Sequence, residues 1–220
     1  MYRVSGSVLV IAIAMMAGGT PWAGAGRLAI PTPPQAALGR IELGRPTLPP
    51  LTYTMFCLRY EGECRSRRGF RGGPVRLTEE RWADLLEVNG LVNLSIVPAP
   101  NNLGLDGEAW SINPDRGDCN DYAVSKRHEL LQRGWPARAL LLSEVIVSSG
   151  EHHLVLLVRT RSGDLVLDNL ASEIKLWSRV PYRWVRVQMP SSNQLWSTID
   201  RKRYRFGRAS TTQSPFPFHD

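Results

Sequence analysis

The chain has 220 residues, a formal net charge of +7 and a sequence pI near 9.8. It is long enough for one domain with a substantial core, and no period of repeat size is visible, which excludes a repeat protein. Nucleic acid is not expected as a partner, because much of the positive excess lies in one cluster near the C-terminus and the N-terminus predicts export.

Residues 1–25 have the pattern of a secretory signal peptide. Arg3 supplies the positive start, Ser7 to Ala17 form an apolar run that is short for a bilayer span, and Ala23-Gly24-Ala25 is a small-residue cleavage site. An N-terminal membrane anchor is the alternative, but Pro21 and the small residues after the run favour processing. We expect a mature chain that begins near Gly26, is soluble after signal removal, and is periplasmic or secreted.

Residues 26–50 are interpreted as a Pro-rich leader, because Ile30 to Pro50 contains six prolines. Proline cannot continue a helix or a central strand, so this stretch is expected to be extended or mobile. The folded domain is then predicted over residues 51–200.

Three cysteines in an exported chain leave one thiol unpaired. Cys57 and Cys64 are separated by the turn-like spacer Glu61-Gly62-Glu63, which can close a small loop, so we expect them to form a disulfide. The alternative is two free thiols in a chain that stays reduced. In either case Cys119 is left over.

Two helices are predicted. Thr78 is a good N-cap with two glutamates after it, and an apolar stripe at helical spacing continues to about Val92 or beyond. A loop rich in Pro, Asn and Gly follows over residues 98–107. The second helix runs from Asp118 to about Arg133, where Gly134 and then a proline end it.

The hydrophobic period then changes to that of strands. Four strands are predicted, the first three of them consecutive and antiparallel, over Ala139 to Val147, His152 to Thr160, Leu165 to Asp168, and Tyr182 to Gln188. Trp177, Trp184 and Trp196 are expected to bury against the sheet. The fold class is therefore α+β, with a helix packed on an antiparallel sheet.

The segment Gly117-Asp118-Cys119-Asn120-Asp121-Tyr122 places the unpaired cysteine in the first turn of the second helix. A helix N-terminus stabilises a thiolate, and His153 and Asp168 follow on predicted strands. This is the order in which papain-like and transglutaminase-like enzymes supply nucleophile, base and orienting carboxylate. A small buried apolar role for Cys119 is the alternative, which its polar flanks disfavour.

The histidine and the aspartate have alternatives of their own. Adjacent strand residues face opposite sides, so only one of His152 and His153 can face Cys119. Asp168 lies one hairpin after His153 and can reach its imidazole, although an aspartate also commonly ends a strand before a turn. Trp110 is considered as a second oxyanion donor beside the Cys119 backbone N–H, with core packing as its alternative.

These segments resemble the bacterial transglutaminase-like cysteine proteinases, which include the LapG-like periplasmic peptidases. The resemblance spans roughly Phe56 to Trp196, and its motifs are Val92-Asn93, Pro98, Trp110, Pro114, Gly-Asp-Cys-Asn-Asp-Tyr-Ala at 117–123, Glu-His-His-Leu-Val-Leu at 151–156, and Leu-Asp-Asn-Leu at 167–170. It implies a papain-like, transglutaminase-like fold, a periplasmic location and proteolysis, and its His-Leu-Val-Leu pattern selects His153. Better-known relatives trim surface adhesins and bind calcium.

The calcium site implied by the resemblance would involve Asp118, Asn120 and Asp121. Calcium-dependent relatives carry acidic residues on both sides of the nucleophile, whereas Asn120 is neutral here. Fewer formal charges weaken a site for a hard cation, so we expect weak calcium binding or none, and the triad itself requires no cofactor.

Three functions are consistent with these residues. The first is hydrolysis of peptide bonds in surface or periplasmic proteins, the second is acyl transfer to an amine as in transglutaminases, and the third is a non-catalytic binding module, which an intact triad disfavours. We expect a monomer that acts on a protein or peptide substrate. A regulatory membrane partner is an open alternative. Residues 201–220, with their cluster of arginines, are interpreted as a basic, disordered tail or as a docking patch for an anionic surface.

Overall fold

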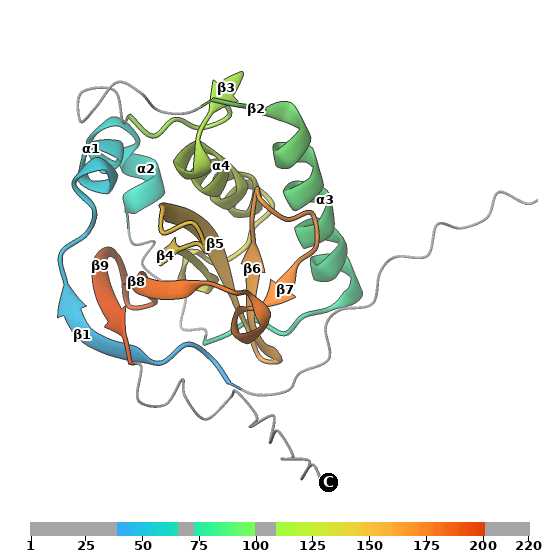
Figure 1. The fold of residues 1–220 in the computed structure, drawn as a ribbon. Coiled ribbons are helices and arrows are strands. Elements are labelled where there is room, and N and C mark those ends of the chain that lie inside the picture. Colours follow the sequence, from blue (N-terminus) through green and yellow to red (C-terminus); the bar gives the residue numbers. More distant parts are fainter. Residues whose placement is uncertain (1–38, 66–72, 100–108, 201–220) are drawn as a thin grey trace, which may run out of the picture. The chain divides into compact units, whose positions relative to one another are not determined.

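The structure is a computed structural model that describes residues 39–65, 73–99 and 109–200 (Figure 1). The described residues belong to one compact unit, residues 32–220. The expected signal peptide (1–25), most of the expected leader, most of the loop at 98–107 and the basic tail (201–220) lie outside the described residues. None of the helices in the described ranges combines the length and apolar character needed to cross a bilayer.

A seven-stranded sheet is the centre of the fold, and every neighbouring pair of its strands is antiparallel. Its spatial order is β1 (Leu43–Thr47), β9 (Ser192–Ile199), β8 (Arg183–Met189), β4 (Leu140–Ile146), β5 (His152–Thr160), β6 (Gly163–Leu167) and β7 (Lys175–Leu176). A separate parallel pair joins β2 (Val97–Pro98) to β3 (Arg116–Gly117). The expected α+β class with an antiparallel sheet is confirmed.

The four predicted strands correspond to β4, β5, β6 and β8, and the bounds of β5 match the prediction. Strands β1, β7 and β9 were not predicted. Strand β1 lies inside the expected leader, where it pairs with β9 and contains Pro46. It is an edge strand, so only one of its sides joins a neighbour, and a proline that donates no hydrogen bond is tolerated there.

In the described ranges four α-helices accompany the sheet, namely α1 (Leu51–Arg59), α2 (Glu61–Cys64), α3 (Glu79–Ser95) and α4 (Cys119–Gln132), with short 3-10 helices at Ala137–Ala139 and Trp177–Arg179. Thr78 caps α3 as predicted, since its side chain accepts a hydrogen bond from the Arg81 N–H. The spacer expected to be turn-like is instead helical in α2. The disulfide between Cys57 and Cys64 is present, with a Cα–Cα distance of 5.6 Å, and it joins α1 to α2.

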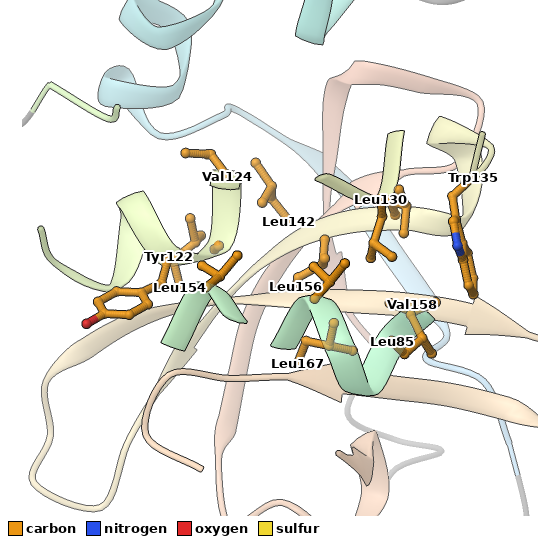
Figure 2. Packing of buried hydrophobic residues seen from close by; sticks show 14 of the residues in the cluster. Leu85, Tyr122, Val124, Leu130, Trp135, Leu142, Leu154, Leu156, Val158 and Leu167 are labelled. Atoms are coloured by element: carbon orange, nitrogen blue, oxygen red, sulfur yellow. The ribbon is translucent and has the colours of Figure 1, made fainter. Parts of the chain in front are cut away.

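Two hydrophobic clusters occupy opposite faces of the sheet. In the larger one, Leu154, Leu156 and Val158 of β5 meet residues of α3 and α4 (Figure 2). The alternate residues of the same strand, Val155 and Leu157, belong to the second cluster. Trp177 and Trp184 are buried in the second cluster and Trp196 in the first, so the expected burial of all three is confirmed. A sheet buried on both faces holds the start of β5 and the end of β6 in fixed positions.

Candidate active site

Cys119 is the first residue of α4, and a capping box fixes this helix start. Asp118 is the N-cap, and its Oδ1 accepts the Asn120 N–H at 2.8 Å. In return Asp121 Oδ2 accepts the Asp118 N–H at 2.9 Å. A side chain at Gly117 would collide with the Asp121 carboxylate, so glycine is required for this close approach. Cys119, whose thiol is free and half-buried, therefore lies at the positive end of a well-capped helix.

His153 and Asp168 form a buried hydrogen-bonded pair. His153 is the second residue of β5 and Asp168 directly follows β6, the next strand of the sheet. His153 Nε2 lies 2.8 Å from Asp168 Oδ1, and the two side chains are only 6% and 4% exposed. The Cys119 side chain also interacts with His153 and raises the pKa of its imidazole. Since Nε2 is bound to Asp168, Nδ1 is the nitrogen left for the thiol.

The electrostatics of this pair favour a charged imidazole. Burial lowers the pKa of His153, but the hydrogen bonds to Asp168 and to Cys119 outweigh it and raise the pKa to about 9. For Asp168, burial raises the pKa, while the His153 hydrogen bond and charge, with the Tyr182 hydroxyl, bring it below its ordinary value. An imidazolium beside a thiol is the arrangement that a cysteine nucleophile requires.

Three more contacts hold Asp168, and sequence reasoning missed all of them. The Tyr182 hydroxyl donates to Oδ2, the Leu170 N–H donates to Oδ1 at 3.0 Å, and Asn93 Nδ2 of α3 donates to the backbone oxygen at 2.9 Å. Asn93 stands in the Val92-Asn93 motif that carried the family resemblance. The sequence around Tyr182 offers no comparable signal, because its contact depends on how the chain returns to the sheet.

Lys126 is a buried cation on the same helix as Cys119, seven residues further on. Its side chain is almost inaccessible, at 1% exposed, and its ammonium lies 5.9 Å from the centre of the Tyr122 ring. Burial lowers the pKa of Lys126 to about 7, and the charge of Asp168 acts in the opposite direction. The positive charge of Lys126 is therefore attracted by the negative charge of the Asp168 carboxylate.

His152 takes no part in the hydrogen bond between His153 and Asp168. Its side chain is 64% exposed, and Nδ1 contacts Glu144 of β4, whose other oxygen binds Arg186 of β8. These three side chains line a cleft of about 270 Å³ that also contains Cys119, Asn120, His153 and Trp110. The sheet register thus separates the two neighbouring histidines, as the alternation of a strand predicts.

Trp110 is a buried core residue that also lies on the wall of the cleft. It is 3% exposed and packs on Tyr53 and Phe56, with ring centroids 5.8 and 6.1 Å away. It also lines the cleft that contains Cys119, and its buried Nε1 has no hydrogen-bond partner among the described residues. Trp184 and Trp196 also have a buried Nε1 without a partner among the described residues, so it is the place of Trp110 on the cleft wall that makes its N–H available to an acceptor on a ligand.

Asp118, Asn120 and Asp121 do not fit a calcium site in this arrangement. Asp118 binds the backbone and side-chain nitrogens of Asn120, and Asp121 accepts the N–H groups of Ser111, at 2.7 Å, and of Asp118. The carboxylates that would bind the cation are thus occupied by the helix cap. In the described ranges, no group of three or more His, Cys, Asp or Glu side chains is arranged to hold a metal ion.

A helix that begins at a free cysteine, packed on an antiparallel sheet that carries a hydrogen-bonded histidine and aspartate, defines the class of transglutaminase-like cysteine peptidases. The chain belongs to the bacterial transglutaminase-like cysteine proteinase family, whose family model matches residues 43–204. This match begins at the first residue of β1 and extends beyond β9.

Solved structures of Legionella pneumophila LapG are similar to this chain. The EGTA-treated form is 25% identical, with a TM-score of 0.42 over 48% of this chain and 61% of LapG. The calcium-bound form is 21% identical, with a TM-score of 0.47 over 66% of this chain and 77% of LapG. A further LapG structure is 26% identical, with a TM-score of 0.43 over 55% and 71%. Among curated proteins, no sequence matches the chain.

Proposed function

We propose that the protein is an exported cysteine peptidase in which Cys119 is the nucleophile, His153 the general acid and base, and Asp168 the residue that orients His153. The observation that carries this proposal is the buried hydrogen bond between His153 and Asp168, together with the free Cys119 thiol, which raises the pKa of His153. Cys119 and His153 both line the same cleft, so a peptide bound there can reach the thiol and the imidazole together.

The reaction follows from these positions. The Cys119 thiolate attacks a peptide carbonyl carbon and forms a tetrahedral intermediate. The His153 imidazolium gives its proton to the leaving amine as the C–N bond breaks, which leaves a thioester on Cys119. Neutral His153 then takes a proton from water, the resulting hydroxide attacks the thioester, and the free carboxylic acid and the Cys119 thiol are released. No metal is needed in any step.

The tetrahedral oxyanion needs N–H donors. The backbone N–H of Cys119 is one, because the first residues of a helix lack carbonyl partners within the helix. The Trp110 indole is the second, supported by its unpartnered Nε1 on the wall of the cleft. Asp121 joins the segments that carry the two donors. Its carboxylate accepts the N–H of Ser111, which follows Trp110, and the N–H of Asp118, which precedes Cys119.

An oxidising compartment is part of the proposal. The disulfide between Cys57 and Cys64 is characteristic of proteins that fold outside the cytoplasm. Together with the predicted signal peptide at 1–25, it supports action in the periplasm or outside the cell, on peptide bonds of surface or periplasmic proteins.

The test is to label the purified mature chain with an alkyne-tagged peptidyl electrophile, beside Cys119→Ala. Labelling and activity should be lost in Cys119→Ala, whose thermal unfolding should stay close to that of the parent. Comparing new protein N-termini in cells with the parent and with Cys119→Ala then identifies the substrates. Equal activity in the two proteins would exclude Cys119 as the nucleophile. Amine-linked products in place of new N-termini would mean that the enzyme transfers acyl groups.

A further inference from the structure

Tyr182 contacts both members of the His153 and Asp168 pair. Its hydroxyl donates to Asp168 Oδ2, and its ring meets the His153 ring edge-on, with centroids 6.0 Å apart and an interplanar angle of 69°. Burial and the Asp168 charge raise the pKa of Tyr182, so the phenol keeps its proton and remains a donor.

The segment that carries Tyr182 is anchored on both sides. Val180 and Trp184 are buried in the second hydrophobic cluster, and Trp184 meets Trp177 edge-on at a centroid distance of 6.0 Å. Trp177 Nε1 in turn donates to the Gly39 carbonyl at 2.8 Å. Because its neighbours are fixed in the core, Tyr182 presents its hydroxyl from a rigid support.

The two oxygens of Asp168 have different partners. Oδ1 is hydrogen-bonded to His153 Nε2 and to the Leu170 N–H, whereas Oδ2 accepts a hydrogen bond from the Tyr182 hydroxyl. The last torsion angle of an aspartate is soft, so contacts to one oxygen leave the carboxylate plane free to turn. A donor on the second oxygen removes that freedom.

We propose that Tyr182 is a positioning residue of this site, which locks the Asp168 carboxylate in the plane that orients His153 toward Cys119. This inference rests on the proposed function, because it assigns how the orienting carboxylate is itself held. The hydroxyl acts through Asp168 and touches no reacting atom.

In the described part of the chain, the groups that interact electrostatically with His153 and Asp168 come from the elements around them, and the exposed Arg183 follows Tyr182 in β8. Strand β5 contributes His153, helix α4 contributes Cys119 and the buried Lys126, and Asp168 follows β6. Glu144, His152 and Arg186 form a separate cluster with one another. A change in the titration of His153 after removal of the hydroxyl would therefore report on Asp168.

The test compares Tyr182→Phe with Tyr122→Phe. Both remove one phenol hydroxyl with a hydrogen bond, but the Tyr122 bond goes to the Ile96 carbonyl, away from the pair. The readouts are the pKa of His153 from carbon-13 NMR of labelled histidines and the rate of labelling of Cys119 by the peptidyl electrophile. The chain has only four histidines, so His153→Gln assigns the signal.

In Tyr182→Phe we expect the pKa of His153 to rise by about half a unit, because a carboxylate that loses a donor concentrates its charge toward the imidazolium. Labelling should slow about tenfold, since His153 is less well oriented. Tyr122→Phe should lower the melting temperature and leave both readouts unchanged. An unshifted His153 pKa in Tyr182→Phe, or a downward shift, overturns this inference. If the electrophile fails to label the parent protein, the proposed function is overturned instead. The NMR titration of His153 would still decide the role of Tyr182.

Discussion

The buried guanidinium of Arg127 donates to the carboxylate of Glu63 at 3.0 Å, and this bond joins the helix that begins at Cys119 to the short helix that ends at Cys64. Arg127 Nε also donates to the Leu140 carbonyl of β4, so the guanidinium links α2, α4 and the sheet. The other Glu63 oxygen contacts His128 at 2.7 Å. Helix α2, which carries Cys64 of the disulfide, therefore supports α4 through an ion pair as well as through packing.

Glu63→Ala should lower the free energy of unfolding by about 3–5 kcal/mol, because it leaves a guanidinium that is 2% exposed without its counter-charge. Urea unfolding monitored by tryptophan fluorescence measures the change. The double variant Glu63→Met with Arg127→Met should recover much of the loss, since neither charge then remains buried alone. A loss in the single variant no greater than that of an exposed control, Glu173→Ala, would contradict this assignment.

The disulfide is checked by mass spectrometry of the mature protein under non-reducing conditions. We expect a peptide that contains Cys57 joined to Cys64, and alkylation at Cys119 alone, in line with the single free thiol of the described structure. Detection of Cys119 in a stable bridge would contradict both the pairing and the proposed nucleophile.

The two neighbouring histidines should differ sharply in function. His153→Ala removes the partner of Asp168 and should slow peptide cleavage by about 10²- to 10⁴-fold, which is the usual contribution of general acid–base catalysis. His152→Ala removes an exposed side chain that contacts Glu144 at the cleft wall, and it should retain most of the activity. Steady-state kinetics on one peptide substrate gives the ranking. A reversed order would mean that His152 is the general base.

Much of this site is predictable because its signals are local. The capping pattern places Cys119 at the start of α4, and strand alternation separates His152 from His153. Tyr182 and Lys126 were not predicted as part of the site. The hydrogen bond of Tyr182 to Asp168, and the interaction of the Lys126 charge with that of Asp168, arise only when the sheet and α4 pack together. Strand β1 was missed for another reason, since its proline, Pro46, excludes only a central strand and says nothing about an edge.

The stability that His153 contributes should depend on pH in a defined direction. Its folded pKa, about 9, lies above the ordinary value of 6.5, so the contribution is fully present below pH 6.5 and is lost as the pH rises toward 9. The loss is on the order of 3 kcal/mol. Lys126 has the opposite trend, because its pKa is lowered to about 7. Comparing the parent with His153→Gln at each pH cancels the Lys126 effect.

Urea unfolding of both proteins from pH 6 to pH 9.5 is the measurement. The difference between their free energies of unfolding should shrink steadily across this range. A constant or growing difference would show that His153 is not held as an imidazolium in the folded state.

Calcium should have little influence on this protein. Asn120 is neutral at a position where the family resemblance implies an acid in calcium-dependent members, and the Asp121 oxygens already accept the N–H groups of Ser111 and Asp118. A calcium ion would therefore have to compete with the contacts that cap α4, at a position with fewer formal charges. We expect labelling of Cys119 by the peptidyl electrophile to be the same in excess EGTA and in excess calcium.

Calorimetric titration of the metal-free protein should accordingly show weak binding or none. The variant Asn120→Glu adds a carboxylate beside Asp118, which should strengthen any binding if this position faces the cation. The matched control is Gln132→Glu, which adds the same charge at an exposed residue at the other end of α4. Tight calcium binding by the unmodified chain that Asn120→Glu fails to strengthen would place the ion elsewhere and refute the argument from Asn120.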